Sequence, residues 1–107
     1  MNWITFDNIG QLTDIQQQSH ARPQVIFKHS TRCSISSMVL RRLEREGVPE
    51  NMDFYFLDLI RFPDISNKVA DAFQVSHESP QILLIKNGDC VYDESHYAIT
   101  LDSLTES

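Results

Sequence analysis

The segment QVIFKHSTRCSISS, residues 24–37, decides the fold that this sequence predicts. It begins with a short apolar run that is β-branched at its centre, which is typical of a strand covered on both faces. From Ser34 to Glu46 the apolar side chains share one helical face, and Gly47 followed by Pro49 ends that helix. Cys33 is therefore expected where a strand ends and a helix begins.

The rest of the chain continues this alternation of strands and helices. The other predicted helices cover residues 5–18 and 63–73, with a short closing helix from about residue 100. The other predicted strands cover residues 53–60, 81–86 and 90–99. Pro63 stands at the helix start, the position that proline tolerates best. Asn87-Gly88 is a strong hairpin signal, so the strand that follows it is expected to return antiparallel.

This order of elements predicts an α/β fold with a central mixed four-stranded sheet and helices on both faces. Strands joined through helices are expected to run parallel, and the final hairpin adds an antiparallel pair. Ligand chemistry in such sheets gathers beyond the carboxyl ends of the parallel strands. Cys33 is expected at that place.

Length, charge and cysteine content exclude several classes of protein. At 107 residues the chain is expected to form one domain, residues 1–107. A formal net charge of −6 argues against a nucleic-acid partner, and no apolar run approaches the roughly 20 residues that span a bilayer. The start of the chain lacks signal-peptide features, so a cytoplasmic protein with reduced thiols is expected. Two cysteines, Cys33 and Cys90, are too few for a disulfide scaffold or a zinc site, and no metal site is predicted.

The surroundings of Cys33 favour a reactive thiol. A thiolate at a helix N-terminus faces free amides and the positive end of the helix dipole, which lower its pKa below about 8.5. The groups predicted to stabilise it, by amide, hydroxyl or positive charge, are Arg32, Ser34, Ile35, Ser36 and Lys28. Helix capping alone would also explain the serine hydroxyls. From position alone, Cys33 as a small packing residue stays open, and so does His29 as either a proton shuttle or a packing residue.

Two further features bear on the site. Ser79-Pro80 directly precedes the third strand, where proline is ordinary, and local sequence alone favours a trans peptide bond. Cys90 lies just past the hairpin turn, and we expect it to pack in the interior rather than to act as a resolving thiol.

Taken together, these features resemble the thioredoxin fold. Within it, FKHSTRCSISS, residues 27–37, is similar to the monothiol bacilliredoxin family, thioredoxin-like proteins associated with the small thiol bacillithiol. The pattern HST-x-C-x-IS and the segment ESHYAIT, residues 94–100, carry this likeness. The resemblance implies that Cys33 is the redox nucleophile and that Ser36 stands where a dithiol relative carries its resolving cysteine. Family members often have proline after the cysteine, whereas this chain has Ser34.

The resemblance also implies a function, a monothiol thiol–disulfide oxidoreductase that removes a bacillithiol-like thiol from mixed disulfides on target proteins. Pro80 would be cis and would bring the Ser79 backbone beside Cys33, where it would bind a substrate chain in extended form. Lys28 or Arg32 would bind the carboxylates of a bacillithiol-like thiol. The predicted substrate-binding residues are therefore Lys28, Ser79 and Pro80. The expected partners are S-thiolated proteins and the small thiol, which is a co-substrate rather than a tightly bound cofactor. A monomer or weak dimer without membrane or nucleic-acid partners is expected.

Two other functions stay open from the sequence. A monothiol glutaredoxin-type iron–sulfur carrier shares the Cys-x-x-Ser pattern, but such proteins usually have glycine at the position of Ser34. A non-catalytic thioredoxin-like adaptor would use Ser79-Pro80 as a peptide-docking edge. A phosphatase-like Cys-x5-Arg loop is excluded, because the required arginine position is Val39.

Overall fold

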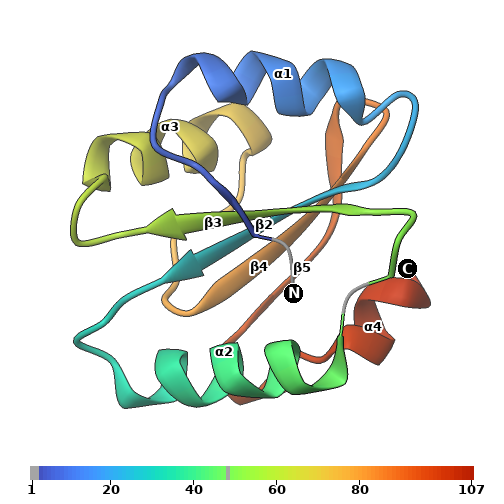
Figure 1. Cartoon of the computed structure of the whole chain (residues 1–107). Helices are drawn as coiled ribbons and strands as arrows, with labels where there is room; N and C mark the ends of the chain where they lie inside the picture. Colours follow the sequence, from blue (N-terminus) through green and yellow to red (C-terminus); the bar gives the residue numbers. More distant parts are fainter. Residues whose placement is uncertain (1–2, 48) are drawn as a thin grey trace.

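The computed structural model describes residues 3–47 and 49–107 as a five-stranded sheet between two layers of helices (Figure 1). The strands are β1 (Trp3–Thr5), β2 (Gln24–His29), β3 (Asp53–Asp58), β4 (Gln81–Lys86) and β5 (Asp89–Ser95). The helices are α1 (Gly10–Gln18), α2 (Ser34–Glu46), α3 (Pro63–Phe73) and α4 (Leu101–Thr105), with a 3-10 turn, η1, at His96–Ala98. Within these ranges, no helix has the length and apolar character needed to cross a membrane.

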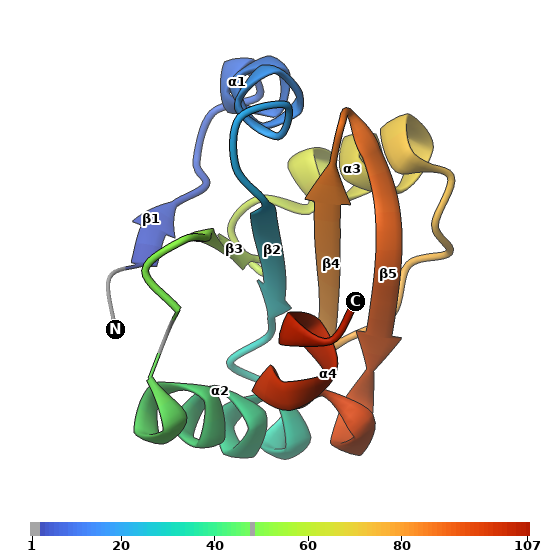
Figure 2. The same cartoon turned by 90° about the vertical axis from the view of Figure 1, so that its right-hand side faces the viewer.

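The sheet has its strands in the order β1-β3-β2-β4-β5, and both of its faces are covered. Figure 2 shows α1 and α3 above the sheet and α2 and α4 below it. Ile26 packs in the core cluster on the α1 and α3 face, whereas Val25 and Phe27 pack in the cluster on the α2 and α4 face. Because both faces of β2 and β4 are buried, the centres of these strands are runs of apolar residues without polar alternation.

The N-terminal segment differs from the sequence prediction. A helix was expected over residues 5–18, but the structure has β1 first and begins α1 at Gly10. The strand is held by parallel pairing with β3 and by Trp3, whose ring lies 5.7 Å from that of Phe27 and 5.8 Å from that of Phe54, centroid to centroid. Three residues are too few to show the alternation of a strand, so the sequence did not predict β1. The sheet therefore has five strands where four were expected.

The direction of β4 also differs from the prediction. β2 and β3 are parallel as expected, but β4 pairs antiparallel with β2, with Lys28 opposite Gln81. The reason is the segment 74–80, which forms no helix or strand and carries the chain back from the end of α3 to the edge where β2 finishes (Figure 1). A strand that starts there can only run against β2.

The local signals at the other element ends are confirmed. Pro63 is the first residue of α3. Asn87 and Gly88 form the β4–β5 turn with φ values of 53° and 83°, the left-handed region that glycine adopts without strain. Thr100 caps α4 by accepting a hydrogen bond from the Ser103 amide at 3.2 Å.

Candidate functional site

Cys33 lies at the junction of β2 and α2, as the sequence predicts. It is the N-cap residue of α2, with extended backbone angles of φ −110° and ψ 116°. Its amide donates to the Ser30 carbonyl at 3.1 Å, and its own carbonyl accepts from the Ser37 amide at 3.2 Å. The side chain is a half-buried free thiol, and within the described chain it makes no capping hydrogen bond to the helix. The backbone is therefore fixed while the sulfur has no structural bond to lose.

The sheet topology brings three distant segments to the same end of the molecule as this thiol. The parallel strands β2 and β3 finish at one edge, and β4 begins there because it runs antiparallel to β2 (Figure 1). This end therefore carries Cys33, Asp58 at the end of β3, and Ser79-Pro80 just before β4. The Ser79-Pro80 peptide bond is cis, as the family resemblance implies, so the trans bond expected from local sequence is wrong.

The cis-proline segment is tied to the 3-10 turn that follows β5. The Pro80 carbonyl accepts a hydrogen bond from the His96 amide at 3.1 Å. His96 Nε2 also lies 3.8 Å from Glu78 Oε2, on the exposed side of the segment. Ser79 Oγ is buried and has no hydrogen-bond partner in residues 3–47 and 49–107. The ESHYAIT segment that carries part of the family likeness thus packs directly against the cis-proline.

Ser36, the residue three positions after Cys33, is engaged with a buried histidine. Its Oγ lies 2.7 Å from His29 Nδ1 and accepts the Ser30 amide at 3.1 Å. Ser36 is fully buried, and His29 is only 4% exposed. Burial lowers the pKa of His29 below its usual value, against an opposing effect from the Asp58 carboxylate. His29 is thus buried beneath the helix head and makes a polar contact with Ser36 there.

Lys28 departs from its predicted role. It was expected to place its charge beside Cys33 and to bind substrate, but neighbouring strand residues point to opposite faces, and its side chain enters the α3 face with no exposed surface. Lys28 Nζ lies 3.4 Å from the Ser66 carbonyl and 3.4 Å from His77 Nδ1. Burial lowers its pKa to about 8. A side chain enclosed in this way cannot meet a carboxylate from solvent, and this part of the predicted site is corrected.

The remaining predicted residues surround the helix head, and within residues 3–47 and 49–107 none of them makes a hydrogen bond to the Cys33 sulfur. Arg32 and Ser34 are exposed, and Ile35 is half-buried against the core cluster on the α2 face. The Arg32 amide donates to Ser30 Oγ at 3.3 Å, which tightens the loop before Cys33. Stabilisation of the thiolate by these residues stays a prediction.

Sequence reasoning missed the cluster formed by Lys28, Ser66 and His77. His77 is exposed in the segment between α3 and β4, and its Nδ1 lies 3.2 Å from Ser66 Oγ as well as near Lys28. The alternation of β2 side chains predicts that Lys28 leaves the face of Phe27 and His29. Nothing local, however, predicts that α3 and the segment before Pro80 would close over it.

Cys90 lies far from this end of the sheet. It pairs with Ile85 next to the β4–β5 turn, and its Sγ donates to the Tyr92 carbonyl at 3.3 Å. Burial, with a further contribution from Asp93, raises the pKa of the Cys90 thiol to about 11. These properties are those of a packed, protonated thiol.

Replacing Cys90 with serine is expected to leave the reaction of Cys33 with thiol reagents within about twofold of the wild-type rate, because the raised pKa leaves little thiolate at neutral pH. The serine hydroxyl keeps a donor for the Tyr92 carbonyl, so the loss of stability should stay near 1 kcal/mol or less. Alkylation kinetics and urea unfolding measure the two quantities. A tenfold slower alkylation would assign Cys90 a part in the site.

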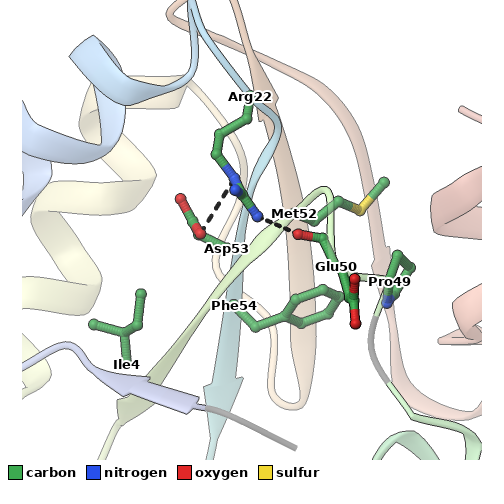
Figure 3. Close-up of a pocket in the computed structure, with 7 residues that line it drawn as sticks. All are labelled: Ile4, Arg22, Pro49, Glu50, Met52, Asp53 and Phe54. Carbon is green, nitrogen blue, oxygen red and sulfur yellow. Dashed lines mark hydrogen bonds and ion pairs between the residues drawn. The ribbon is translucent and has the colours of Figure 1, made fainter.

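A separate hollow lies at the opposite end of the sheet. Figure 3 shows the residues that line this space of about 290 Å³: Ile4, Arg22, Pro49, Glu50, Met52, Asp53 and Phe54. Arg22 Nε lies 3.3 Å from Asp53 Oδ1, and the same guanidinium donates to the Glu50 carbonyl. Arg22 and Asp53 thus form an ion pair at the start of β3, whereas Cys33 follows the end of β2. The hollow is not part of the thiol site.

A single thiol at a helix head, on a mixed sheet whose same end carries a cis-proline, defines the class of thioredoxin-fold thiol proteins. Solved structures agree. The thioredoxin of Malassezia sympodialis superimposes with a TM-score of 0.76 at 17% identity over 98% of this chain and 86% of that one. The thioredoxin of Fasciola hepatica gives 0.68 at 18% identity over 95% and 92%. A protein assigned as an oxidoreductase with a thioredoxin fold gives 0.80 at 29% identity over 96% and 90%.

The particular family follows from the sequence of the chain. The family described as monothiol bacilliredoxin BrxC matches residues 4–104, and the chain belongs to that family. The match spans β2, Cys33, the cis-proline segment and the ESHYAIT stretch, which includes every segment of the thiol site. Family and fold together make this a redox thiol protein.

Proposed function

We propose that the protein is a monothiol thiol–disulfide oxidoreductase that uses Cys33 to remove a bacillithiol-like thiol from mixed disulfides on target proteins. The observation that carries this proposal is the placement of the Cys33 thiol. It is a free sulfur at the N-cap of α2, at the end of the sheet where the cis Ser79-Pro80 bond lies. Backbone amides at a helix N-terminus favour a thiolate, which is the nucleophile in disulfide exchange.

The reaction would run in two exchange steps. In the first, the Cys33 thiolate attacks the small-thiol sulfur of the mixed disulfide, so that a new S–S bond joins Cys33 to the small thiol. The target sulfur leaves with the electron pair of the broken bond and takes a proton from solvent. In the second step, another small-thiol thiolate attacks the adduct, giving the small-thiol disulfide and regenerating the Cys33 thiolate.

The second step requires a thiol from outside the chain. The position where a dithiol protein would hold its resolving sulfur is occupied by Ser36, whose hydroxyl cannot form a disulfide. Cys90 lies beside the β4–β5 turn at the other end of β4, with a raised pKa. A small thiol or a partner protein with a free cysteine is therefore the resolving group.

Substrate binding is assigned to Ser79, Pro80 and Arg32, of which Ser79 is half-buried, Pro80 is buried and Arg32 is exposed. The backbone of Ser79, turned by the cis bond to Pro80, would hold the target chain in an extended form next to the sulfur. Arg32 is exposed one residue before Cys33 and could pair with a carboxylate of the small thiol by charge-assisted hydrogen bonds. Lys28 has no share in this binding because its side chain is fully buried.

The proposal is tested by mass spectrometry of the intact protein. Wild-type protein is mixed with a peptide that carries bacillithiol in a mixed disulfide, and the same peptide carrying glutathione is the comparison. We expect the free peptide thiol to be released in step with a one-bacillithiol adduct on Cys33, and more slowly with glutathione. If Cys33 gains no adduct under conditions that modify a free peptide thiol, the exchange function is wrong and the adaptor alternative gains support.

A further inference from the structure

A buried polar pair lies directly under the head of α2. His29 Nδ1 lies 2.7 Å from Ser36 Oγ, and two phenylalanine rings pack beside His29. The ring centroids of Phe27 and Phe56 lie 5.9 Å and 5.2 Å from that of His29. Because buried polar groups are costly without partners, this pair restricts where each of its protons can go.

The protons of the pair can be counted. The Ser36 hydroxyl has one proton to give and two lone pairs to fill, and one lone pair accepts the Ser30 amide at 3.1 Å. When His29 Nδ1 carries no proton, the hydroxyl proton goes to Nδ1 and the second lone pair is free. When Nδ1 is protonated, it donates to that lone pair, and the hydroxyl proton is free to turn elsewhere.

The proposed nucleophile lies three residues before this hydroxyl. Cys33 is the N-cap residue of α2 and Ser36 is its third residue, so the two side chains start about one helical turn apart. Within the described residues no hydrogen bond joins Cys33 Sγ to Ser36 Oγ, and the relay requires the half-buried sulfur to turn toward the hydroxyl. A thiol there can donate to the free lone pair of Ser36 Oγ, and a thiolate there can accept the freed hydroxyl proton. Both states of the pair therefore have a matching state of the sulfur.

We propose that His29 is a positioning residue for Cys33 and that Ser36 relays the proton between them; this inference rests on the exchange function proposed above. On ionisation the Cys33 proton moves to Ser36 Oγ while the Ser36 proton moves to His29 Nδ1. The products are a thiolate that accepts the Ser36 hydroxyl and an imidazolium that donates to the same oxygen. Once Cys33 is held in the new disulfide, His29 returns its proton to solvent, and the leaving target thiolate takes up a proton from solvent as described above.

The charges around His29 fit such a relay. Asp58 lies opposite His29 in the β2–β3 register, and the negative charges of Asp58 and, to a smaller extent, of Glu44 on α2 raise the pKa of His29. Burial lowers it, and burial has the larger effect. His29 is thus neutral at rest, ready to accept a proton, and two carboxylates favour the imidazolium once it forms. Lys28, the neighbouring cation, points to the other face of the sheet and does not oppose this.

The first test measures the pH dependence of Cys33 alkylation by iodoacetamide, a reagent that needs no target and no bacillithiol. Ser36→Ala removes the relay and should raise the apparent pKa of Cys33, so that alkylation at a fixed pH below that value slows about tenfold. Ser36→Thr keeps the hydroxyl and should restore most of the rate. An unchanged profile in a folded Ser36→Ala protein would overturn the relay. Because the exchange reaction is not used, this outcome is separate from failure of the proposed function.

The second test follows His29 itself by nuclear magnetic resonance in the wild-type chain, which needs no variant to fold. We expect Nδ1 to be unprotonated at rest. We also expect the His29 pKa to be lower in the alkylated protein, where no Cys33 thiolate can form. Because coupling between two sites is reciprocal, this difference should equal the difference in Cys33 pKa between neutral and protonated His29. Ser36→Ala should remove most of this difference. A resting Nδ1 that carries the proton, or a His29 pKa that ignores the state of Cys33, would overturn the proposal.

Discussion

Cys33→Ser is expected to abolish thiol exchange, with a fall of at least about a thousandfold in the rate of peptide release from a mixed disulfide. A serine hydroxyl is not ionised at neutral pH and cannot form a stable bond to sulfur. Cys33 is the N-cap residue of α2, but its thiol makes no capping hydrogen bond to the helix. The folded structure should therefore tolerate the change and unfold at nearly the wild-type urea concentration. Stopped-flow release assays and urea titration measure the two effects separately.

Cys90→Ser is the matched control, because it makes the same atomic exchange at the other cysteine of the chain. It should retain full activity while Cys33→Ser has none. If Cys33→Ser kept even a tenth of the wild-type rate, a second nucleophile would have to act in its place. The assignment of the chemistry to Cys33 would then be wrong.

Lys28→Met is expected to stabilise the protein by roughly 2–3 kcal/mol at pH 7. A lysine pKa lowered from 10.5 to about 8 corresponds to a cost of roughly 3 kcal/mol for holding the ammonium group in the folded state. Methionine has a similar length and carries no charge, and such replacements of buried charges are often stabilising. His77 Nδ1 keeps Ser66 Oγ as a partner at 3.2 Å, and the Ser66 carbonyl, inside α3, keeps its helical hydrogen bond, so the substitution leaves neither acceptor of Lys28 without a partner.

The gain should depend on pH in a definite direction. Below about pH 8 both the folded and the unfolded wild-type chains hold the Lys28 proton, and the full cost is present. Between about 8 and 10.5 the folded chain has lost this proton while the unfolded chain keeps it, so wild-type stability rises with pH. The advantage of Lys28→Met should therefore shrink over this interval and vanish above it.

Lys68→Met is the matched control, because Lys68 is exposed on α3 and its replacement removes the same charge from the chain. Its stability should stay within about 0.5 kcal/mol of wild type at every pH. Urea unfolding of the three proteins at pH 7 and pH 9.5 makes the comparison. A Lys28→Met protein less stable than wild type at pH 7 would show that the Lys28 ammonium group has a favourable partner.

Much of the fold could be predicted because its signals are local. The β2–α2 junction at Cys33 follows from an apolar run next to an amphipathic one, and Pro63 and Asn87-Gly88 identify a helix start and a turn by backbone preference alone. β1 could not be found, since a three-residue strand is defined only by its pairing with β3. The direction of β4 depends on the path of segment 74–80 across the sheet, and no local preference records that path.

The site divides along the same physical line. Short sequence motifs predict the position of Cys33 and, through the family resemblance, the cis bond at Pro80. The structure has Cys33 at the predicted position and Ser79-Pro80 in the cis form. The burial of Lys28 and the contact of Ser36 with His29 depend on what packs over β2 from elsewhere in the chain. The sequence therefore predicted more positive charge beside Cys33 than the structure has, because Lys28 points to the other face of the sheet.

The two cysteine sulfur atoms of the chain lie at opposite ends of the sheet, Cys33 after β2 and Cys90 beside the β4–β5 turn. An intramolecular bridge would require the sheet to come apart, so the folded molecule has no closed, self-contained oxidised form. When Cys33 is oxidised by exchange, it therefore carries the partner thiol in a mixed disulfide, and the electron pair of the broken bond goes to the leaving thiolate. The oxidation state of a population of these molecules could thus be read directly from its mass.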